Sequence, residues 1–314
     1  MSQPRIAVVG NPNTGKSTLF NALTGLRQKV GNYPGVTVEE HVGTAKLAQI
    51  EVQLVDVPGT YSLAAHSPDE MLAIDLLTGN LSGYAAPNAV LIVLDASNLR
   101  RNLFFASQVL ELGLPTVVAL NMTDVARDKG VSVNPQALSE LLGANVIEVC
   151  ATKLEGFDAL KQALQSAVAS PQPSSLQIMP DVRAKALELT ADANFGNAGR
   201  VDIERALIDS DSYAAQRIQS QQGDNAIAIL QQAQAELSPN APLGAEEARR
   251  RYQWIDAQLP NLVEKAEASP KKLGDLFDRA LAHPLLGTLG FVFVMATVFQ
   301  AVFAWDVQMM EAID

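Results

Sequence analysis

The sequence contains a single cysteine, Cys150, among 314 residues. One thiol cannot form an intrachain disulfide, and sparse cysteine is typical of proteins that work in a reducing compartment. Positive charge is also scarce, since 23 Lys and Arg residues stand against 34 Asp and Glu residues and the formal net charge is −11. Because binding to a phosphate backbone needs a basic surface, this balance argues against a nucleic-acid partner.

The start of the sequence lacks the long apolar segment that directs secretion. Met1–Arg5 leads directly into the short apolar run Ile6–Val9, so we expect this part of the chain to remain in the cytoplasm. Histidine is scarce too. His41, His66 and His283 lie far apart in the sequence, so we interpret them as structural or solvated residues and not as a metal-binding cluster.

Residues 10–18 predict a phosphate-binding loop. They follow a short apolar run and precede a segment with the apolar spacing of a helix, which is the order of strand, loop and helix that such a site requires. Gly10 and Gly15 allow the backbone to turn its N–H groups toward a phosphate at the positive end of the helix. Lys16 adds a charge for the β and γ phosphates, and the Ser17 hydroxyl is a ligand for Mg²⁺. The predicted nucleotide contacts are Gly10, Asn11, Pro12, Asn13, Thr14, Gly15, Lys16, Ser17 and Thr18.

The next segment, Leu26–Glu39, is predicted to be an irregular loop, because two glycines and a proline around Thr37 disfavour regular structure. We interpret it as a switch. The Thr37 hydroxyl would bind Mg²⁺ and its amide the γ-phosphate, with Gly35 and Val36 beside it, so that the order of the loop depends on that phosphate. Taken alone, a surface loop with a solvated threonine is the simpler interpretation.

Residues 38–47 and 50–57 are expected to form adjacent strands. The second strand ends at Asp56, three residues before Gly59. This spacing predicts the second half of a phosphate site, in which Asp56 holds Mg²⁺ through water and the Gly59 amide contacts the γ-phosphate. The simpler alternative is a strand that ends in a Pro-Gly turn.

Three further apolar runs predict buried strands, and helical patterns lie between them. This alternation is typical of an α/β fold with a mostly parallel sheet and helices on both faces, in which ligands bind at the carboxyl ends of the strands. The expected strands are Ala89–Asp95, Pro115–Leu120 and Asn145–Val149, and the expected helices are Asp69–Thr78, Leu99–Leu112 and Gly156–Val168.

Asn121–Asp124 follows one of these strands and predicts the site where the base is selected. The Asp124 carboxylate can accept hydrogen bonds from the N1–H and the exocyclic amine of guanine, whereas adenine would leave it facing an acceptor, at a cost of several kcal/mol. We therefore expect GTP to be favoured over ATP. Asn121 would brace the loop and the purine edge, and the Ala151 amide would reach the guanine O6. The predicted base contacts are Asn121, Met122, Thr123, Asp124, Cys150, Ala151 and Thr152.

The composition changes after this predicted nucleotide domain, which we place at residues 1–169. A linker is predicted at 170–178, and helical spacing without strand-like runs predicts an all-α domain at 179–282. We interpret the cluster Arg249–Arg251 in this domain as a solvated helix face rather than as a phosphate or partner site.

A charge-free run from Pro284 to Trp305 then predicts a membrane-spanning helix. Roughly 22 residues would form a helix of about 33 Å, enough to cross the core of a bilayer. Lys271, Lys272 and Arg279 precede the run and would keep the preceding domains on the cytoplasmic side. A hydrophobic core helix is the alternative. The assigned ranges are 283–306 for the helix and 307–314 for a truncated tail.

These motifs resemble those of a known family, the bacterial ferrous iron transport protein B (FeoB). The resemblance covers the whole chain, and its Pro-Gly-Val-Thr and Pro-Gly-Thr-Tyr-Ser-Leu motifs are distinctive. In that family a GTPase domain is joined to a helical domain that favours the GDP-bound state, and a membrane part moves ferrous iron inward. The residues that carry the resemblance are Gly10–Thr18, Asn32–Glu39, Asp56–Leu63, Asn121–Asp124 and His283–Pro284.

The resemblance implies a P-loop, Ras-like GTPase fold that binds GTP or GDP with Mg²⁺, followed by a domain like a GDP-dissociation inhibitor. It implies ferrous iron as the transported ion, a lipid bilayer as a partner, and the inner membrane of a bacterium as the location. The full-length protein would be multi-pass, with this region facing the cytoplasm. A homo-oligomer and a small accessory protein of the same transport system are further expected partners.

Two positions depart from related GTPases. Cys150 stands where most relatives carry Ser, which would alter base affinity and nucleotide release slightly. Thr60 follows Gly59 where Ras-like enzymes place a water-orienting Gln, so intrinsic hydrolysis should be slow and should depend on Lys16, Thr37, Mg²⁺ and the Gly59 amide.

The resemblance also suggests a potassium ion between the phosphates. Asn13 and the switch-loop carbonyls near Gly31 and Tyr33 would bind it, and the ion would stand in for an arginine finger.

Two other functions stay open at this point. One is a soluble regulatory or ribosome-assembly GTPase whose hydrophobic tail binds a partner, and the other is a membrane-tethered nucleotide sensor without a transport role. The acidic charge and the charge-free tail favour the transporter, because relatives that bind RNA usually carry a basic module.

Overall fold

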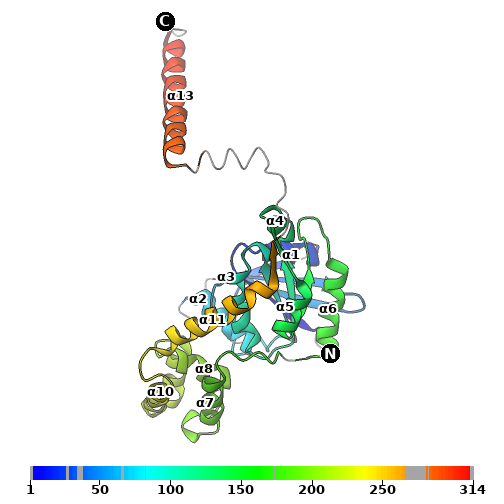
Figure 1. Cartoon of the computed structure of the whole chain (residues 1–314), viewed down its shortest axis with the longest axis vertical. Coiled ribbons are helices and arrows are strands. Elements are labelled where there is room, and N and C mark those ends of the chain that lie inside the picture. Colours follow the sequence, from blue (N-terminus) through cyan, green and yellow to red (C-terminus); the bar gives the residue numbers. More distant parts are fainter. Residues whose placement is uncertain are drawn as a thin grey trace. The chain divides into compact units, whose positions relative to one another are not determined.

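The structure of the protein, a computed structural model, describes residues 3–25, 28–33, 38–64, 67–81, 83–172, 174–265, 281 and 283–311. The chain divides into two compact units, Met1–Glu267 and Ala268–Asp314. Figure 1 shows the first unit as a sheet with surrounding helices, and the second as one long helix.

The first unit is built on seven strands: β1 (Arg5–Gly10), β2 (Gln28–Asn32), β3 (Glu39–Lys46), β4 (Glu51–Asp56), β5 (Ala89–Asp95), β6 (Thr116–Asn121) and β8 (Asn145–Glu148). They lie side by side in the order β2-β3-β4-β1-β5-β6-β8. The pairs β4-β1, β1-β5, β5-β6 and β6-β8 are parallel. The pairs β2-β3 and β3-β4 are antiparallel. The predicted α/β fold with a mostly parallel sheet is confirmed.

Helices connect these strands at the predicted positions, and two more lie between β6 and β8, where the sequence predicts none. They are α1 (Lys16–Thr24), α2 (Pro68–Thr78), the 3-10 turn η1 (Ala96–Asn98), α3 (Leu99–Leu110), α4 (Thr123–Asp128), α5 (Pro135–Leu142) and α6 (Phe157–Ala169).

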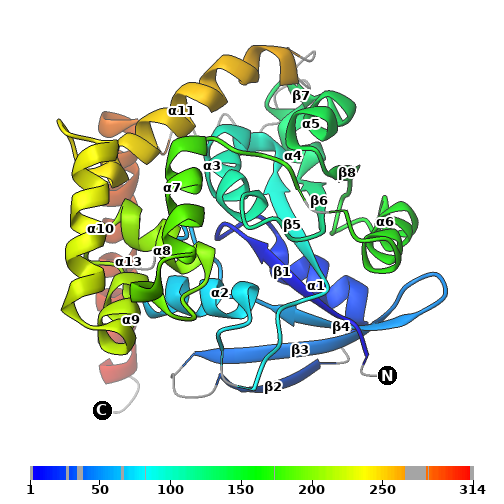
Figure 2. The ribbon, with the colours of Figure 1, turned by 90° about the horizontal axis from the view of Figure 1, so that it is seen from below.

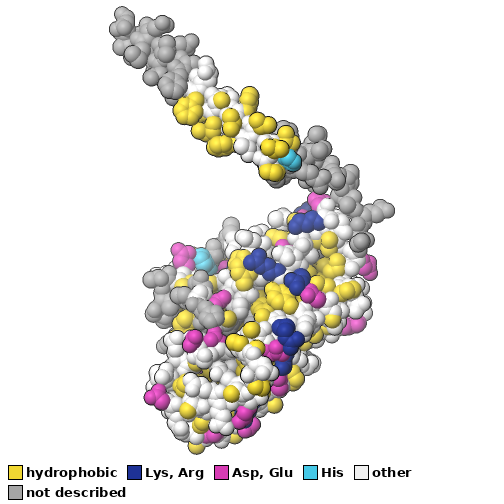
Figure 3. Space-filling view, turned by 60° about the vertical axis from the view of Figure 1, so that its left-hand side comes forward, with side chains coloured by type: hydrophobic (Ala, Val, Ile, Leu, Met, Phe, Trp, Pro, Cys, Tyr) yellow, Lys and Arg dark blue, Asp and Glu magenta, His cyan; other side chains and the backbone are white. Residues whose placement is uncertain are grey.

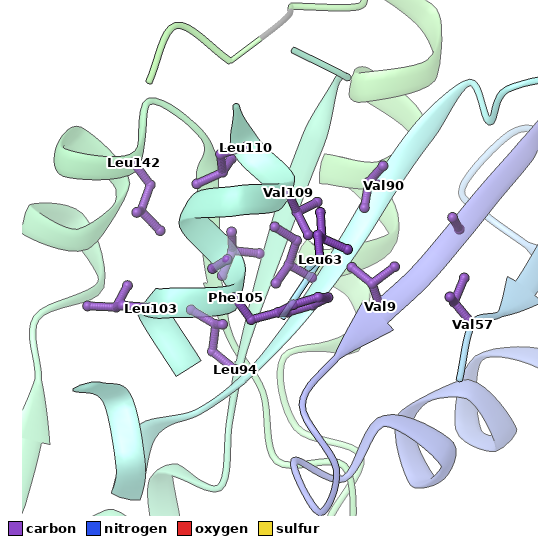
Figure 4. Close-up of a cluster of buried hydrophobic side chains, with 14 of the residues drawn as sticks. Val9, Val57, Leu63, Val90, Leu94, Leu103, Phe105, Val109, Leu110 and Leu142 are labelled. Carbon is purple, nitrogen blue, oxygen red and sulfur yellow. The ribbon is translucent and has the colours of Figure 1, made fainter. Parts of the chain in front are cut away.

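Both faces of the sheet are buried, which is why its central strands are continuously apolar. Alternate residues point to opposite sides, so Val9 and Val90 pack in one core with α2, α3 and α5, while Val8 and Leu91 pack in another with α1 and α6. Figure 4 shows Phe105 of α3 beside Val9 in the first of these cores. Helix α1, which follows the phosphate loop, therefore packs against a sheet that is buried on both faces.

Local sequence signals set the ends of the helix that follows the Asp56 segment. Ser67 begins α2 with a capping box, because its hydroxyl accepts a hydrogen bond from the Glu70 amide and the Glu70 carboxylate accepts one from the Ser67 amide, both at 3.3 Å. The helix ends at Gly79, whose φ of 77° lies in the left-handed region that favours glycine.

A helical bundle follows the sheet: α7 (Pro180–Thr190), the turn η2 (Ala193–Phe195), α8 (Arg200–Ile208), α9 (Tyr213–Gln222), α10 (Asp224–Leu237) and α11 (Leu243–Leu262). Ile203, Leu207 and Ile218 lie in a third core, while Ile255 and Leu262 of α11 pack in the first core of the sheet. Figure 2 shows α7 to α10 gathered beside the sheet, and α11 running from them toward α5. Because the bundle belongs to the same compact unit as the sheet, the boundaries at 169 and 179 remain predictions.

The strands β2, β7 (Val131–Val133) and β9 (Val263–Lys265) lie where the sequence predicts none. β2 occupies part of the segment predicted to be irregular, and it pairs with β3 despite its glycine. β9 lies in the range predicted to be all-α and pairs antiparallel with β7. Both expectations were wrong because pairing with another strand overrides local propensity, and three residues are too few to form a recognisable pattern.

The interpretation of Arg249–Arg251 as a solvated face is also wrong for its last residue. Arg251 is fully buried, contacts Glu111 of α3, and bonds the Glu247 carboxylate at 2.8 Å and the Ser107 hydroxyl at 3.0 Å. Arg249 remains largely exposed. The sequence shows only the charges, and the partners that bury Arg251 include residues of a distant helix of the sheet domain.

The second unit contains α13 (Pro284–Glu311). Its segment Pro284–Ala301 has a mean hydropathy of 1.7 and no buried part, and among the described residues it alone is long and apolar enough to cross a membrane. Figure 3 shows hydrophobic side chains covering the described part of this helix. The segment predicted to span the membrane, 283–306, thus forms a helix whose length and composition are sufficient to cross one. The three preceding basic residues, Lys271, Lys272 and Arg279, lie outside the described residues.

Glu247→Gln should destabilise the protein by about 3 kcal/mol at pH 7, because it removes the carboxylate that pairs with the buried Arg205 guanidinium and leaves Arg251 with Glu111. Although burial opposes ionisation, Arg205 and Arg251 lower the pKa of Glu247 to about 2 from an ordinary 4.5. A folded pKa below the unfolded one stabilises the protein above pH 4.5 and loses this effect as the pH falls toward 2.

Chemical unfolding of both proteins across this pH range measures the difference. The difference in the free energy of unfolding between wild type and Glu247→Gln should become smaller as the pH falls. A difference that stays constant would contradict the assigned ion pair. Glu246→Gln is the matched control: this neighbouring carboxylate also binds arginines, but at the surface, so its loss should matter much less.

Candidate functional site

The loop between β1 and α1 has the backbone of a phosphate-binding loop. Asn13 and Gly15 adopt left-handed conformations with φ of 65° and 81°. A Cβ on Gly10 would lie 2.7 Å from the Val93 carbonyl oxygen, and a Cβ on Gly15 would collide with the Asn121 side chain. Both glycines are therefore required by close approach, and the loop turns back directly above the sheet.

The Asn121 side chain ties this loop to the predicted base site. Its amide nitrogen donates to the Thr14 carbonyl oxygen at 2.9 Å, and its amide oxygen accepts from the Ala151 N–H at 3.1 Å. The predicted bracing role of Asn121 thus has a specific geometry. The Ala151 N–H, which the sequence places on the guanine O6, donates to Asn121 in this structure.

The two halves of the predicted phosphate site lie together. The Lys16 ammonium contacts the Asp56 carboxylate, and both side chains are about nine-tenths buried. A Cβ on Gly59 would lie 3.3 Å from the Pro12 nitrogen, so the segment after Asp56 touches the phosphate loop. In this structure the Lys16 ammonium, which is predicted to bind phosphate, forms an ion pair with the Asp56 carboxylate, which is predicted to hold Mg²⁺.

Ser17 and Asp56 offer hydroxyl and carboxylate oxygens, the hard ligands that Mg²⁺ prefers, so these residues fit a magnesium ion that completes its coordination with phosphate and water. Ser17 is exposed at the start of α1. No cluster of three or more His, Cys, Asp and Glu side chains that could hold a metal ion occurs within the described ranges.

The base site is built on the left-handed residue Met122, with φ of 59°, which starts α4 and leads through Thr123 to Asp124. The Asp124 carboxylate accepts hydrogen bonds from the Val125 amide at 2.9 Å and from the Cys150 thiol at 3.5 Å. Although partial burial opposes it, these two bonds and the nearby Lys153 ammonium lower the pKa of Asp124 below its ordinary value. The carboxylate is therefore ionised, as an acceptor for two base N–H groups must be.

Cys150 begins the second group of predicted base contacts, Cys150–Thr152. Its thiol is also 3.4 Å from the Thr152 hydroxyl, and the residue is 3% exposed. The predicted contacts Cys150, Ala151 and Thr152 thus lie beside the Asn121–Asp124 motif.

Thr60, which replaces a glutamine of Ras-like enzymes, is turned away from solvent. Its hydroxyl donates to the Ser62 carbonyl oxygen at 2.8 Å and contacts the Glu70 carboxylate at 3.2 Å. Tyr61, the next residue, is 41% exposed, and its ring lies 3.8 Å from the Arg101 guanidinium. The Thr60 hydroxyl is engaged in local hydrogen bonds.

Part of the predicted switch lies outside the described residues, namely Gly35, Val36 and Thr37, and so does His66. The predicted potassium contacts are separated along the chain: Asn13 is exposed in the phosphate loop, Gly31 pairs with Glu40 in the β2-β3 ladder, and Tyr33 directly follows β2.

Some residues that connect the site to the helical bundle were not predicted from the sequence. The Gln108 side chain of α3 accepts from the Leu63 N–H at 2.9 Å and donates to the Glu247 carboxylate at 3.2 Å. A glutamine in a helix carries no sequence signal for such a role.

Asn11 was predicted as a nucleotide contact, but its burial was not. Both polar atoms of its side chain are buried and lack a hydrogen-bond partner in the part of the chain that the structure describes.

Comparison with known proteins identifies relatives of this arrangement. The Fe(2+) transporter FeoB of Escherichia coli O157:H7 is 35% identical over 95% of this chain. The Fe(2+) transporter FeoB of Salmonella typhimurium (strain LT2) is likewise 35% identical over 95% of the chain. The chain spans 38% of the length of each of these relatives.

Two solved structures are similar in fold. The cytosolic domain of L. pneumophila FeoB superposes with a TM-score of 0.68 at 32% identity, over 83% of this chain and all of that one. A GDP-bound point mutant of the S. thermophilus FeoB G-domain superposes with a TM-score of 0.70 at 30% identity, over 83% and 100% of the two chains.

A family model for the ferrous iron transport protein B matches residues 4–164, the range that contains the phosphate loop, Asp56, the Asn121–Asp124 motif and Cys150. The chain belongs to the ferrous iron transport protein B family.

Proposed function

We propose that the sheet domain binds GTP and hydrolyses it to GDP and phosphate. The observation that carries this proposal is the position of Asn121, whose side chain holds the phosphate loop and the base loop together at the carboxyl ends of the strands. Ligands of parallel α/β sheets bind at this edge. A guanine nucleotide is the ligand that satisfies both the Lys16 loop and the ionised Asp124.

The phosphates would lie over the N–H groups of residues 10–18, with Lys16 released from Asp56 to the β and γ phosphates. Ser17, Asp56 and Thr37 would hold Mg²⁺, which supplies charge neutralisation for the leaving phosphate. The Gly59 amide would donate to the γ-phosphate from its place beside Pro12. Since the Thr60 hydroxyl is engaged elsewhere, these groups carry the reaction without a water-orienting side chain, and the intrinsic rate is low.

The base is selected by the carboxylate of Asp124. Guanine presents two N–H donors to it, while adenine presents an acceptor that leaves the charge unpaired, and this difference favours GTP over ATP. Asn121, Met122 and Thr123 shape the loop, and Cys150, Ala151 and Thr152 form its other wall. Calorimetry with GTP, GDP and ATP, combined with a GTP turnover assay, tests the proposal directly, and an absence of guanine preference would refute it.

The whole protein is proposed to transport ferrous iron across the inner membrane of a bacterium, with GTP hydrolysis regulating or driving uptake. Relatives named Fe(2+) transporter support this, as does the exposed apolar helix α13. This region would face the cytoplasm of a multi-pass protein, and residues 179–282 would act as a domain that favours GDP retention. A homo-oligomer and a small accessory protein are further proposed partners.

The membrane assignment can be tested with lipid vesicles. The full chain should float with the vesicles in a density gradient, whereas a chain that ends at Ala282 should stay in the soluble fraction, because α13 supplies the apolar surface. Equal behaviour of the two chains would favour a soluble protein with a partner-binding tail.

Asp124→Asn should weaken GDP binding by about a hundredfold or more, because the amide donates where guanine also donates. The same variant should gain affinity for xanthosine diphosphate, whose base offers an acceptor at that position. Calorimetry with both nucleotides measures the exchange of preference. Unchanged GDP affinity would remove Asp124 from the base site.

Replacing K⁺ by Na⁺ should lower the GTP turnover rate, since the smaller ion is not matched to the ligands proposed here, Asn13 and the carbonyls near Gly31 and Tyr33. Asn13→Ala should abolish the difference between the two salts, because the exposed Asn13 side chain is the ligand that the substitution removes. Turnover in matched KCl and NaCl buffers gives the ratio, and a variant that keeps the wild-type ratio would exclude Asn13 as a ligand.

A further inference from the structure

The side chain of Tyr33 links two segments of the proposed site. Tyr33 directly follows β2 and is 1% exposed. Its hydroxyl donates a hydrogen bond to the Asp56 carbonyl oxygen at 3.1 Å. Asp56 ends β4, and its carboxylate is the proposed magnesium ligand that contacts Lys16. One phenol therefore connects the end of β2 to the end of the magnesium strand.

The backbone of Tyr33 is fixed as well. Its N–H donates to the Val38 carbonyl oxygen at 3.0 Å, which extends the β2-β3 pairing beyond Asn32 and Glu39. Tyr33 thus forms the last described pair of this hairpin. Because both its amide and its hydroxyl are bonded, the residue has one position relative to Asp56.

The Tyr33 side chain lies beside a second tyrosine. The Tyr84 ring lies 6.0 Å from the Tyr33 ring, and the Tyr84 hydroxyl contacts the Glu40 carboxylate. The Arg5 guanidinium lies 4.9 Å from the centre of the Tyr84 ring. The Tyr33 residue is 1% exposed, and a buried hydroxyl donor without an acceptor is costly, so the burial of this side chain favours its bond to Asp56.

We propose that Tyr33 is a positioning residue for magnesium: its hydroxyl holds the end of β4 through the Asp56 carbonyl and so keeps the Asp56 carboxylate aimed at the ion. The proposal rests on the proposed GTP hydrolysis. It concerns the side chain of Tyr33, and it is independent of the potassium contact proposed for the carbonyl.

The test compares Tyr33→Phe with Tyr84→Phe in the full chain in detergent. Tyr33→Phe keeps the ring and removes the bond to Asp56, so the Mg²⁺ concentration for half-maximal GTP turnover should rise about fivefold, the effect of one ordinary hydrogen bond. GDP affinity measured in EDTA should change less, because the Lys16 loop and the base contacts do not involve this hydroxyl. Tyr84→Phe removes a neighbouring hydroxyl that binds Glu40 and not Asp56, so its Mg²⁺ dependence should match that of wild type.

Thermal unfolding of both variants establishes that they are folded at the assay temperature. A wild-type Mg²⁺ dependence in Tyr33→Phe, or an equal shift in both variants, would overturn the positioning role while leaving GTP hydrolysis intact. If wild type itself shows no Mg²⁺-dependent turnover of GTP, the proposed function fails, and this inference fails with it.

Discussion

The arrangement of the site depends on the two hydrogen bonds of one buried carboxamide. Asn121 donates to the Thr14 carbonyl oxygen and accepts from the Ala151 N–H. A single side chain therefore fixes the phosphate loop and the segment Cys150–Thr152 against the end of β6. An aspartate would lack the donor and a leucine would lack both groups. The same closeness explains Gly15, because any Cβ there would occupy the space of the Asn121 amide. The spacing between the proposed phosphate and base contacts is thus set by packing within the protein.

Much of this site is predictable from the sequence because its signals are local, whereas the remaining features depend on distant partners. Strands buried on both faces are continuously apolar, so the run Ala89–Asp95 is recognised with its bounds, and parallel strands place their carboxyl ends, with the motifs that follow, at one edge. Arg251, in contrast, resembles part of an exposed basic cluster, yet it is buried because Glu111 and Ser107 of α3 face it. Likewise, β2 forms because β3 is beside it, not because its own residues favour a strand.

Long-range contacts of this kind attach the bundle at two places beside the segment that follows Gly59. One is the buried group around Glu247, where Gln108 bonds both this carboxylate and the Leu63 N–H. The other is Arg217 of α9, which bonds Asp75 of α2 at 2.6 Å and Asp202 of α8 at 2.8 Å. Buried ion pairs tolerate little misalignment, because a separated charge remains desolvated. The bundle is therefore held in one position against α2 and α3, the helices that flank this segment.

The end of the bundle reaches a different part of the site. The Asn134 N–H donates to the Leu262 carbonyl oxygen at 2.9 Å, and β9 then pairs with β7, which follows α4 and the Asn121–Asp124 motif. The bundle thus ends at a strand that follows α4 and the residues proposed to recognise the base. A displacement of β9 would pass through β7 and α4 to Asp124, and guanine, the base that Asp124 is proposed to recognise, is common to GTP and GDP. Such a displacement would change the affinity for both nucleotides, whereas the contact at Leu63 lies in the segment after Gly59, which is proposed to sense the γ-phosphate.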